Sequence, residues 1–399
     1  MKAAPDNTLP LKGVVVIAVE QAVAAPFASR QLADLGARVI KIERPGVGDF
    51  ARSYDTTVKG LASHFVWTNR SKESLTLDLK RPEAVDVLTR LVARADVFMH
   101  NLAPGAIGRL GFGSDVLRAR YKRLITCEIS GYGSSGPYRD KKAYDLLVQS
   151  EAGLVSITGT DDTPSKVGIS IADIAAGMYA FSGVLAALLR REQTGEGSAL
   201  EVSMFDALAE WMGFPAYFTE YGGTAPPRSG ARHASIAPYG PYLAGDGQPV
   251  YLGLQNEREW ARFCADVLQR PALVDDERFA SNSARVAHQE ALDDVIGKAF
   301  AGLSAADVIA RLDAAGIANA RMNSMQDFIA HPQLAARNRW RDVDSPAGPL
   351  RALVPPVMLD DAEPVMGPVP ALGEHTDRIL VELGYDATTI AEWHRRRIV

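Results

Sequence analysis

The stretch GVVVIAVEQAVAAPFASRQLADLGARVIKI, residues 13–42, decides the fold of the N-terminal part of this chain of 399 residues. An apolar run covers residues 13–19, small residues dominate 24–35, and a second apolar run covers 37–42 after Gly36. This order predicts a strand, a helix and a second strand. The sequence therefore predicts a β-α-β unit with its two strands parallel.

The same alternation continues along the chain. The pattern predicts a helix over 82–94, a strand over 96–100, a helix from about 106, a strand over 123–130, a helix over 174–191 and a strand over 199–204. We therefore expect an α/β fold with a doubly wound parallel sheet, whose strand ends face a ligand crevice. Residues 20–26, EQAVAAP, contain no glycine. The dinucleotide fingerprint is thus absent, and a nicotinamide or flavin cofactor is not expected.

A second, smaller unit follows a long loop. Residues 220–242 are rich in Gly, Pro and Arg and lack periodicity, which indicates a functional or inter-domain segment. Beyond this loop, a strand over 249–254 and helices over 257–268, 287–300 and 304–315 predict a small α+β domain.

Composition excludes several classes of protein. Lys and Arg number 43 against 48 Asp and Glu, a net charge of −5, so nucleic acid is not an expected partner. Cys127 and Cys264 are the only cysteines and offer no disulfide framework. No membrane span or export signal is visible, and we expect a cytoplasmic protein. The seven histidines show no metal-ligand spacing, so no metal is expected.

Asp173 is the candidate nucleophile. It lies in VGISIADIAAG, residues 167–177, between an extended apolar run and a helix built from small residues. Its position is typical of a helix N-cap, and capping alone would explain the residue. A carboxylate at a helix N-terminus is also held ionised and could attack an acyl group to form an anhydride.

Cations near the predicted strand ends form a second group of candidates. The group comprises Arg44, Arg70, Lys72 and Arg109. A separate cluster, Lys141, Lys142, Tyr144 and Asp145, follows the glycine-rich loop 131–138 and could hold phosphate and position a carbonyl. Each of the cations could equally be exposed on a loop. Together they would make a local basic rim of the kind that a polyphosphate ligand needs.

Seven segments, in order along the chain, carry a family resemblance. They are LPLKGVVVIAVEQAVAAPFASRQLADLGARVIKIERPGVGDFAR at 9–52, NRSKESLTLDLK at 69–80, HNLAPGAIGRLGF at 100–112, GYGSSGPY at 131–138, the Asp173 segment, TGEG at 194–197 and LGEHTD at 372–377. As a set they resemble the class III (CaiB/BaiF) CoA-transferases, which include formyl-CoA transferase, the carnitine CoA-transferases and α-methylacyl-CoA racemase.

The resemblance implies a site and an architecture. Asp173 matches the catalytic aspartate of the family, with acyl-CoA as a substrate and no permanently bound cofactor. The positions that match CoA contacts are Val23, Ala24, Arg44, Lys72, Asn101, Leu102, Arg109, Lys142, Tyr144 and Asp145. The family also implies an interlocked homodimer, in which residues 1–215 begin a large Rossmann-like CoA-binding domain, 225–325 form a small domain and 326–399 return to the large one.

The acyl groups are expected to be dicarboxylates. Arg228, Arg232 and His233 lie in a segment whose counterpart would approach the active site, where arginines could bind a second substrate carboxylate. A surface linker rich in arginine is the other interpretation. The stretches EQAVAAPF and GDFARSYD resemble family members that act on four- and five-carbon dicarboxylates. We expect succinyl-CoA as donor and an acceptor of the itaconate, mesaconate, malate or citramalate type.

Three alternatives stay open. One is intramolecular CoA transfer between the two carboxyls of a dicarboxylate, as in the mesaconyl-CoA C1–C4 isomerases. Another is an acyl-CoA racemase, although Tyr144 stands where the racemase branch resembles a histidine and two-base proton transfer needs that group. The third is a non-catalytic CoA-binding protein, against which Asp173 with Lys142 and Tyr144 argues.

Overall fold

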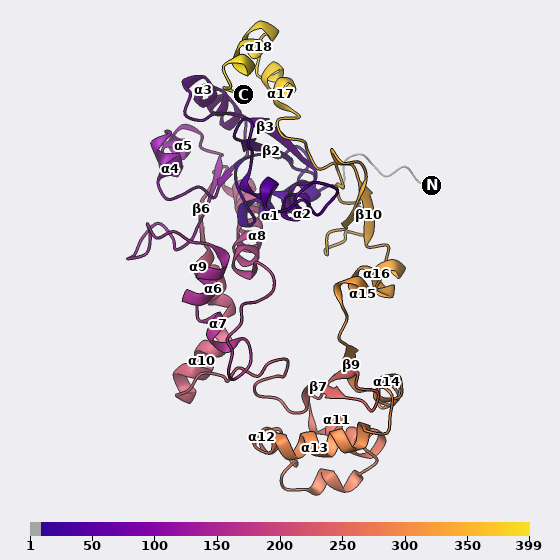
Figure 1. Cartoon of the computed structure of the whole chain (residues 1–399). Helices are drawn as coiled ribbons and strands as arrows, with labels where there is room; N and C mark the ends of the chain where they lie inside the picture. Colours follow the sequence, from indigo (N-terminus) through magenta and orange to yellow (C-terminus); the bar gives the residue numbers. More distant parts are fainter. Residues whose placement is uncertain (1–8) are drawn as a thin grey trace. The chain divides into compact units, whose positions relative to one another are not determined.

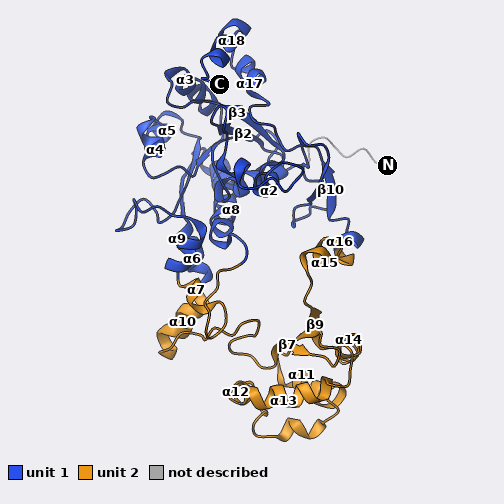
Figure 2. Ribbon diagram, in the orientation of Figure 1, with its two compact units in different colours: residues 1–152, 168–212, 334–399 blue, residues 153–167, 213–333 orange. Residues whose placement is uncertain are grey.

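The computed structural model describes residues 9–399. The chain forms two compact units (Figure 2): unit 1 comprises the chain up to Ala152, Gly168–Met212 and Leu334–Val399, and unit 2 comprises Gly153–Val167 and Gly213–Gln333. Residues 1–8 lie outside the described residues. The expectation of no export signal, and the first residues of the range 1–215, therefore fall partly outside them.

A parallel sheet of six strands forms the centre of unit 1, which confirms the predicted α/β fold. Its strands are β1 (Val15–Val19), β2 (Arg38–Glu43), β3 (Lys72–Thr76), β4 (Val97–His100), β5 (Ile125–Ser130) and β6 (Ala199–Ser203). They run in the order β3-β2-β1-β4-β5-β6, and each neighbouring pair is parallel. The long apolar runs of β1 and β2 suit such a sheet, because helices cover both of its faces.

Helices and one hairpin complete unit 1 (Figure 1). They are α1 (Ala24–Asp34), the 3₁₀ turn η1 (Phe50–Ser53), α2 (Ser63–Asn69), α3 (Pro82–Val92), α4 (Ala106–Arg109), α5 (Ser114–Arg120), α6 (Asp145–Glu151), α8 (Ile171–Thr194), α9 (Met204–Trp211), β10 (Trp340–Val343), β11 (Leu350–Leu353), α17 (Thr376–Glu382) and α18 (Ala387–Arg395). The short helix α16 (Pro332–Ala336) spans the chain position where unit 2 ends and unit 1 resumes.

Helices α1 and α8 pack side by side (Figure 1). A Cβ atom added to Gly177 of α8 would lie 2.7 Å from the carbonyl oxygen of Ala24. Since real Cβ atoms do not approach so closely, only glycine allows this contact between the two helices. The small residues around Asp173 therefore serve close helix packing, and they bring the start of α8 next to the start of α1.

Within the described residues, α8 is also the one helix long and apolar enough to cross a membrane by length and composition, with a mean hydropathy of 1.7 in an 18-residue window. In this fold 44% of that window is buried, and Ala175, Ala176 and Ala180 are part of the core of unit 1. Core helices meet the same criterion, so the finding is weak evidence for a span.

The C-terminal segment belongs to the large sheet. Ile379 and Leu380 of α17 lie in one hydrophobic cluster with Leu75 of β3. The backbone amide of Thr76 donates to the hydroxyl oxygen of Thr376 at 3.1 Å. The LGEHTD segment thus lies at the edge of the sheet formed by β3.

Unit 2 has its own core. An antiparallel sheet contains β7 (Tyr239–Leu243), β8 (Pro249–Gly253) and β9 (Ala318–Arg321) in that order. Its helices are α7 (Leu154–Ile157), α10 (Gly213–Gly222), α11 (Glu257–Arg262), the π turn η2 (Phe263–Val267), the 3₁₀ turn η3 (Pro271–Asp275), α12 (Asn282–Ala287), α13 (Gln289–Phe300), α14 (Ala305–Ala314) and α15 (Met325–Ile329). Trp260, Phe263 and Phe300 are fully buried in this core.

Candidate active site

Asp173 lies in the first turn of α8, but it is not the N-cap that the sequence predicts. Ser170 occupies the N-cap position and makes no side-chain capping bond. Instead, Oδ1 of Asp145 accepts hydrogen bonds from the backbone amides of Ala172 at 2.8 Å and Asp173 at 3.2 Å. The cap comes from a different helix because α6 packs against α8. Among the described residues, none donates a hydrogen bond to the Asp173 carboxylate itself.

The environment of Asp173 stabilises the neutral carboxylic acid relative to the charged carboxylate. Burial and the negative charge of Asp145 raise the pKa of Asp173 from its ordinary value to about 7. A carboxylate with this pKa has more basicity, and hence more nucleophilicity, than an exposed aspartate, while remaining largely ionised above neutrality. Because no described residue donates a hydrogen bond to this carboxylate, Asp173 can attack an electrophilic carbonyl without leaving a donor unsatisfied.

Two tyrosines share this region. Burial, together with the charges of Asp49 and Asp173 and the neighbouring Tyr144, raises the pKa of Tyr54. Both rings are exposed, Tyr54 directly after η1 and Tyr144 directly before α6. Sequence reasoning included Tyr144 but missed Tyr54, although the GDFARSYD segment contains it. The two tyrosines thus place phenolic groups in the region of Asp173.

A cavity of about 240 Å³ lies beyond the carboxyl ends of β1, β2 and β3. Its lining residues are Val19, Glu20, Gln21, Ile42, Glu43, Arg44, Gly48, Asp49, Leu77, Asp78, Leu79, Lys80, Leu102 and Leu110. Of the predicted CoA contacts, Arg44 and Leu102 line it directly. Lys80, which sequence reasoning did not select, is a second cation there. Apolar walls with cations at their edge suit a ligand that joins a flat apolar group to phosphates.

Asn101, Val23 and Ala24 shape the turn between β1 and α1. The Asn101 side chain accepts from the Gln21 amide at 2.9 Å and donates to the Gln21 carbonyl at 2.8 Å. Val23 and Ala24 are buried at the start of α1, which has no side-chain cap. Asn101 therefore stabilises this turn, and both its side-chain oxygen and its side-chain nitrogen are hydrogen-bonded to the Gln21 backbone.

Lys72 does not contribute to an exposed basic rim. Its ammonium is fully buried and donates to Oε1 of Glu20 at 2.7 Å, the carbonyl of Pro26 at 2.9 Å and Oδ1 of Asn69 at 3.0 Å. Burial, only partly offset by the charge of Glu20, lowers the pKa of Lys72 to about 7. An ammonium has three N–H donors, so none is left for a phosphate. Arg70, also assigned to the rim, is likewise buried and paired with Asp34 at 2.8 Å.

Arg109 and Lys142 are exposed. Neither side chain forms a hydrogen bond or ion pair with any residue in the described range. Both remain available to an anionic ligand, unlike Lys72. Arg44 is also exposed and lies over the ring of Phe50, 4.6 Å from its centroid.

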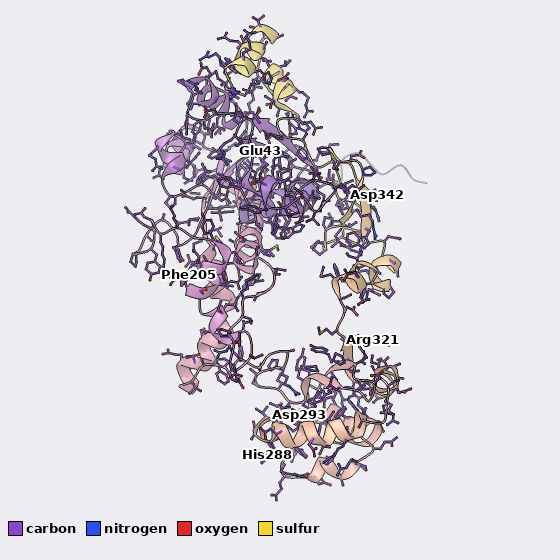
Figure 3. All side chains as sticks on the ribbon, viewed as in Figure 1. Glu43, Phe205, His288, Asp293, Arg321 and Asp342 are labelled. Atoms are coloured by element: carbon purple, nitrogen blue, oxygen red, sulfur yellow. The ribbon has the colours of Figure 1, made fainter. Side chains whose placement is uncertain are left out.

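The three predicted substrate contacts all lie in unit 2. Arg228 donates to the backbone carbonyls of Ser156, Thr160 and Asp161. Arg232 pairs at 3.0 Å with Asp293, which lies on α13 and is labelled in Figure 3. His233 stacks on the ring of Tyr239, with ring centroids 5.3 Å apart. Arg228 thus fastens the 153–167 segment to the rest of unit 2, a segment that sequence reasoning assigned to the N-terminal domain.

Residues 9–399 contain no group of three or more His, Cys, Asp or Glu side chains that could hold a metal ion. The candidate reactive groups of unit 1 are the Asp173 carboxylate, two phenols and the cations near an apolar cavity. This set describes an enzyme site for carboxyl or acyl transfer to an anionic carrier.

The chain belongs to CoA-transferase family III, whose model matches residues 11–376. It is 33% identical to the succinate–glutarate CoA-transferase of Agrobacterium fabrum, covering 95% of this chain and 97% of that protein. It is 32% identical to the succinyl-CoA–D-citramalate CoA-transferase of Chloroflexus aurantiacus, covering 98% of both proteins. A CaiB/BaiF family protein from Brucella suis has a similar crystal structure, with a TM-score of 0.82, 32% identity and coverage of 94% and 99%. The protein is thus a transferase of the CoA-transferase class.

Proposed function

We propose that the protein transfers CoA from succinyl-CoA to a four- or five-carbon dicarboxylic acid. Relatives with 32–33% identity over nearly the whole chain carry names with a succinyl or succinate partner and a five-carbon diacid, glutarate or citramalate. Itaconate, mesaconate, malate and citramalate are the acceptors that the sequence pattern favours. The observation that carries the proposal is the half-buried Asp173 carboxylate, which receives no hydrogen bond from the described residues.

In each half-reaction of the proposed mechanism, Asp173 acts first as a nucleophile, through its carboxylate oxygen, and then as an electrophile, through its activated carbonyl. A carboxylate oxygen attacks the thioester carbonyl of the donor, the C–S bond breaks, and CoA thiolate leaves behind a mixed anhydride. The thiolate then attacks the aspartyl carbonyl, which releases the donor carboxylate and leaves an aspartyl-CoA thioester. The acceptor carboxylate repeats these steps in reverse and regenerates Asp173. No proton is transferred in the balance, so a second acid or base is unnecessary.

Binding of CoA is proposed to use the cavity and the exposed cations. Arg44 and Lys80 line the cavity, and Arg109 and Lys142 have no partner among the described residues. Charge-assisted contacts with phosphate are among the stronger polar contacts available to a protein. Val23, Ala24, Asn101, Leu102, Tyr144 and Asp145 complete the proposed site by shaping its backbone or its walls.

The far carboxylate of the acyl group is proposed to bind the loop of Arg228, Arg232 and His233. A guanidinium has five N–H donors, so the pairing of Arg232 with Asp293 leaves donors for a second carboxylate. Arg228 is engaged by three carbonyls, and its proposed role is to hold the loop.

An interlocked homodimer with a Rossmann-like large domain is also proposed. The strand order of the sheet is that of dinucleotide-binding α/β proteins. Helix α10 has no buried residue in the single chain, and it exposes Phe214, Tyr217 and Tyr221. Such a concentration of exposed aromatic side chains supports an interface. Light scattering during gel filtration tests it, and a monomeric mass would exclude the dimer.

Cytoplasmic placement is proposed from the cysteines. Cys127 and Cys264 are both buried free thiols, and burial raises the pKa of each to about 12. Neither forms a disulfide, which suits a reducing compartment. Fractionation of the source cells checks this placement.

The direct test of function is a CoA-exchange assay followed by mass spectrometry. Purified protein with succinyl-CoA and one acid at a time, including glutarate, itaconate, mesaconate, malate, citramalate, oxalate and butyrate, should form acyl-CoA of the dicarboxylic acids. Formation of new acyl-CoA only from butyrate, or no exchange with any acid, would contradict the proposal. Rearrangement of a mesaconyl-CoA without free acid would favour the intramolecular alternative.

A further inference from the structure

The turn between β1 and α1 has an unusual backbone conformation at Ala22. This residue has a φ of +61°, in the left-handed region that residues with a Cβ atom rarely adopt. No glycine relieves the turn, since residues 20–26 contain none. A conformation of this kind persists only where surrounding contacts enforce it.

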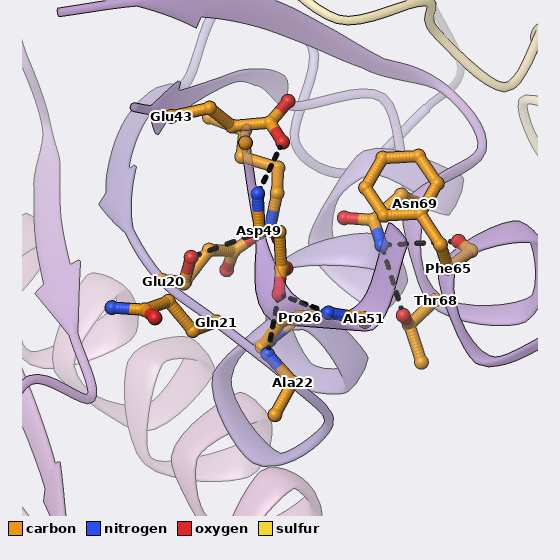
Figure 4. Close-up of polar contacts among 12 residues, drawn as sticks. Glu20, Gln21, Ala22, Pro26, Glu43, Asp49, Ala51, Phe65, Thr68 and Asn69 are labelled. Carbon is orange, nitrogen blue, oxygen red and sulfur yellow. Dashed lines mark hydrogen bonds and ion pairs between the residues drawn. The ribbon is translucent and has the colours of Figure 1, made fainter. Parts of the chain in front are cut away.

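Asp49 supplies that enforcement (Figure 4). Its Oδ1 accepts the backbone N–H of Ala22 at 2.9 Å and that of Ala51 at 2.9 Å. Its Oδ2 accepts from Nζ of Lys41 at 2.7 Å. Both side chains of this ion pair have no exposed surface. One carboxylate therefore joins the turn after β1 to the η1 segment that leads to Tyr54.

The ion pair is held in place from its other side. Nζ of Lys41 also lies 3.4 Å from Oε1 of Glu20, and the backbone amide of Asp49 donates to Oε1 of Glu43 at 3.0 Å. Burial alone would lower the pKa of Lys41, but the charges of Asp49 and Glu20 outweigh burial and raise it. The lysine therefore stays charged, and its charge fixes the orientation of the Asp49 carboxylate.

The turn connects the two parts of the proposed site. Gln21 lines the cavity together with Asp49. Three residues after Gln21, Ala24 contacts Gly177 of α8, one turn of helix beyond Asp173. Any shift of the turn would move the cavity wall relative to the helix that carries the nucleophile.

We propose that Asp49 is a positioning residue for acyl transfer: its carboxylate holds Ala22 in the left-handed conformation and thereby sets the alignment of the acyl-CoA site with Asp173. The identity of the ligand in this inference rests on the proposed function. Asp49 does not touch the reacting atoms. Its effect is exerted through the backbone of residues 21–24, where a small misplacement costs turnover more than affinity.

Three changes separate positioning from plain stabilisation. Asp49→Asn leaves one oxygen and one NH₂ group, so it cannot accept from Ala22 and from Lys41 at the same time. Ala22→Val makes the left-handed conformation more costly, because the new side chain is β-branched. Ala22→Gly removes the cost of that conformation. Gln269→Val is the matched control, since Gln269 is exposed in unit 2 and has a φ of +56°.

The experiment measures kcat and KM with succinyl-CoA and glutarate, binding of free CoA by calorimetry, the melting temperature, and hydrogen exchange of the 20–26 peptide. We expect Asp49→Asn and Ala22→Val to lower kcat by at least about tenfold, with a smaller change in KM, and to accelerate exchange of that peptide. Ala22→Gly in the Asp49→Asn protein should restore part of kcat, whereas Gln269→Val should leave kcat unchanged.

Unchanged kcat in Ala22→Val and Asp49→Asn, or a loss in Asp49→Asn that Ala22→Gly does not relieve, would overturn the inference. If Asp49→Asn does not fold, the Ala22→Val protein and its control decide. If the native protein binds CoA but exchanges none with glutarate or the other acids, the proposed function fails separately. Positioning is then judged by CoA affinity and by exchange of the 20–26 peptide, and no effect on either would contradict it.

Discussion

The backbone amide of Asp173 donates a hydrogen bond to the carboxylate of Asp145 at 3.2 Å. Asp145 therefore caps α8, and it also places a negative charge beside the side chain of Asp173. Together with burial, this charge raises the pKa of Asp173 to about 7. The same contact thus fixes the position of the proposed nucleophile and adds to the effect of burial, which raises the pH at which the carboxylate becomes reactive.

The first prediction is a pH dependence. Because only the ionised carboxylate attacks, kcat/KM for the acyl-CoA donor should rise through a midpoint near pH 7 and fall by about tenfold per pH unit well below it. Initial rates between pH 5 and 9 measure this curve. Asp145→Asn keeps an acceptor for the cap but removes the charge, so its midpoint should lie lower. An unchanged midpoint in that variant would assign the shift to burial alone.

A second prediction concerns stability. The pKa of Asp173 is higher in the folded protein than that of an ordinary aspartate. The stabilisation that results is fully present below the ordinary pKa and is lost as pH rises through about 7. Asp173→Asn replaces the carboxyl group by a side chain that does not ionise, so the variant does not lose stability in this pH range. The variant should melt higher than the native protein at pH 8, by roughly 1–2 °C if about 1 kcal/mol is recovered. At pH 5 the difference should shrink, and calorimetry at both pH values checks it.

The third prediction contrasts two cations. Lys72→Met leaves Glu20 buried with a weaker set of partners, and loss of one partner from a buried pair costs about 3–5 kcal/mol. Arg109→Ala should leave the unfolding free energy nearly unchanged and weaken binding of CoA by about 1–3 kcal/mol. Chemical denaturation and calorimetry of CoA binding measure the two effects. If Lys72→Met is as stable as the native protein but binds CoA more weakly, this prediction is contradicted and Lys72 is assigned a contact with a CoA phosphate.

The fourth prediction tests the far carboxylate. Arg232→Ala should reduce kcat/KM for succinate or glutarate far more than for butyrate, because only a diacid leaves a carboxylate without its partner. Asp293→Asn is the control, since it frees Arg232 from its ion pair without removing the cation. Equal losses for diacid and monoacid in Arg232→Ala would assign the arginine to the structure of unit 2.

Local patterns predicted the sheet better than the site. The apolar runs around β1 and β2 define strands without any distant partner, so the β-α-β unit was predictable. Strand β3 was not, because its residues KESLT carry two charges. Lys72 tolerates burial there only because Glu20, 52 residues away, neutralises it.

The N-terminal cap of α8 also could not be predicted from the local sequence. Asp173 resembled an N-cap because it precedes a helix of small residues, whereas the capping carboxylate comes from Asp145, 28 residues earlier. Segment 153–167 has no periodic run, and its membership of unit 2 depends on Arg228 contacts that span 67–72 residues. Contacts over such distances leave no local signal in the sequence.

The central claim is that Asp173 forms covalent intermediates, first a mixed anhydride with the acyl group and then a thioester with CoA. The protein is incubated with succinyl-CoA, quenched with hydroxylamine, digested and analysed by peptide mass spectrometry, alongside Asp173→Asn. We predict a hydroxamate on the peptide that contains Asp173 in the native protein, none in the variant, and a loss of turnover in the variant of at least about 10³-fold. Labelling of another carboxylate, or near-normal turnover by Asp173→Asn, would contradict the account.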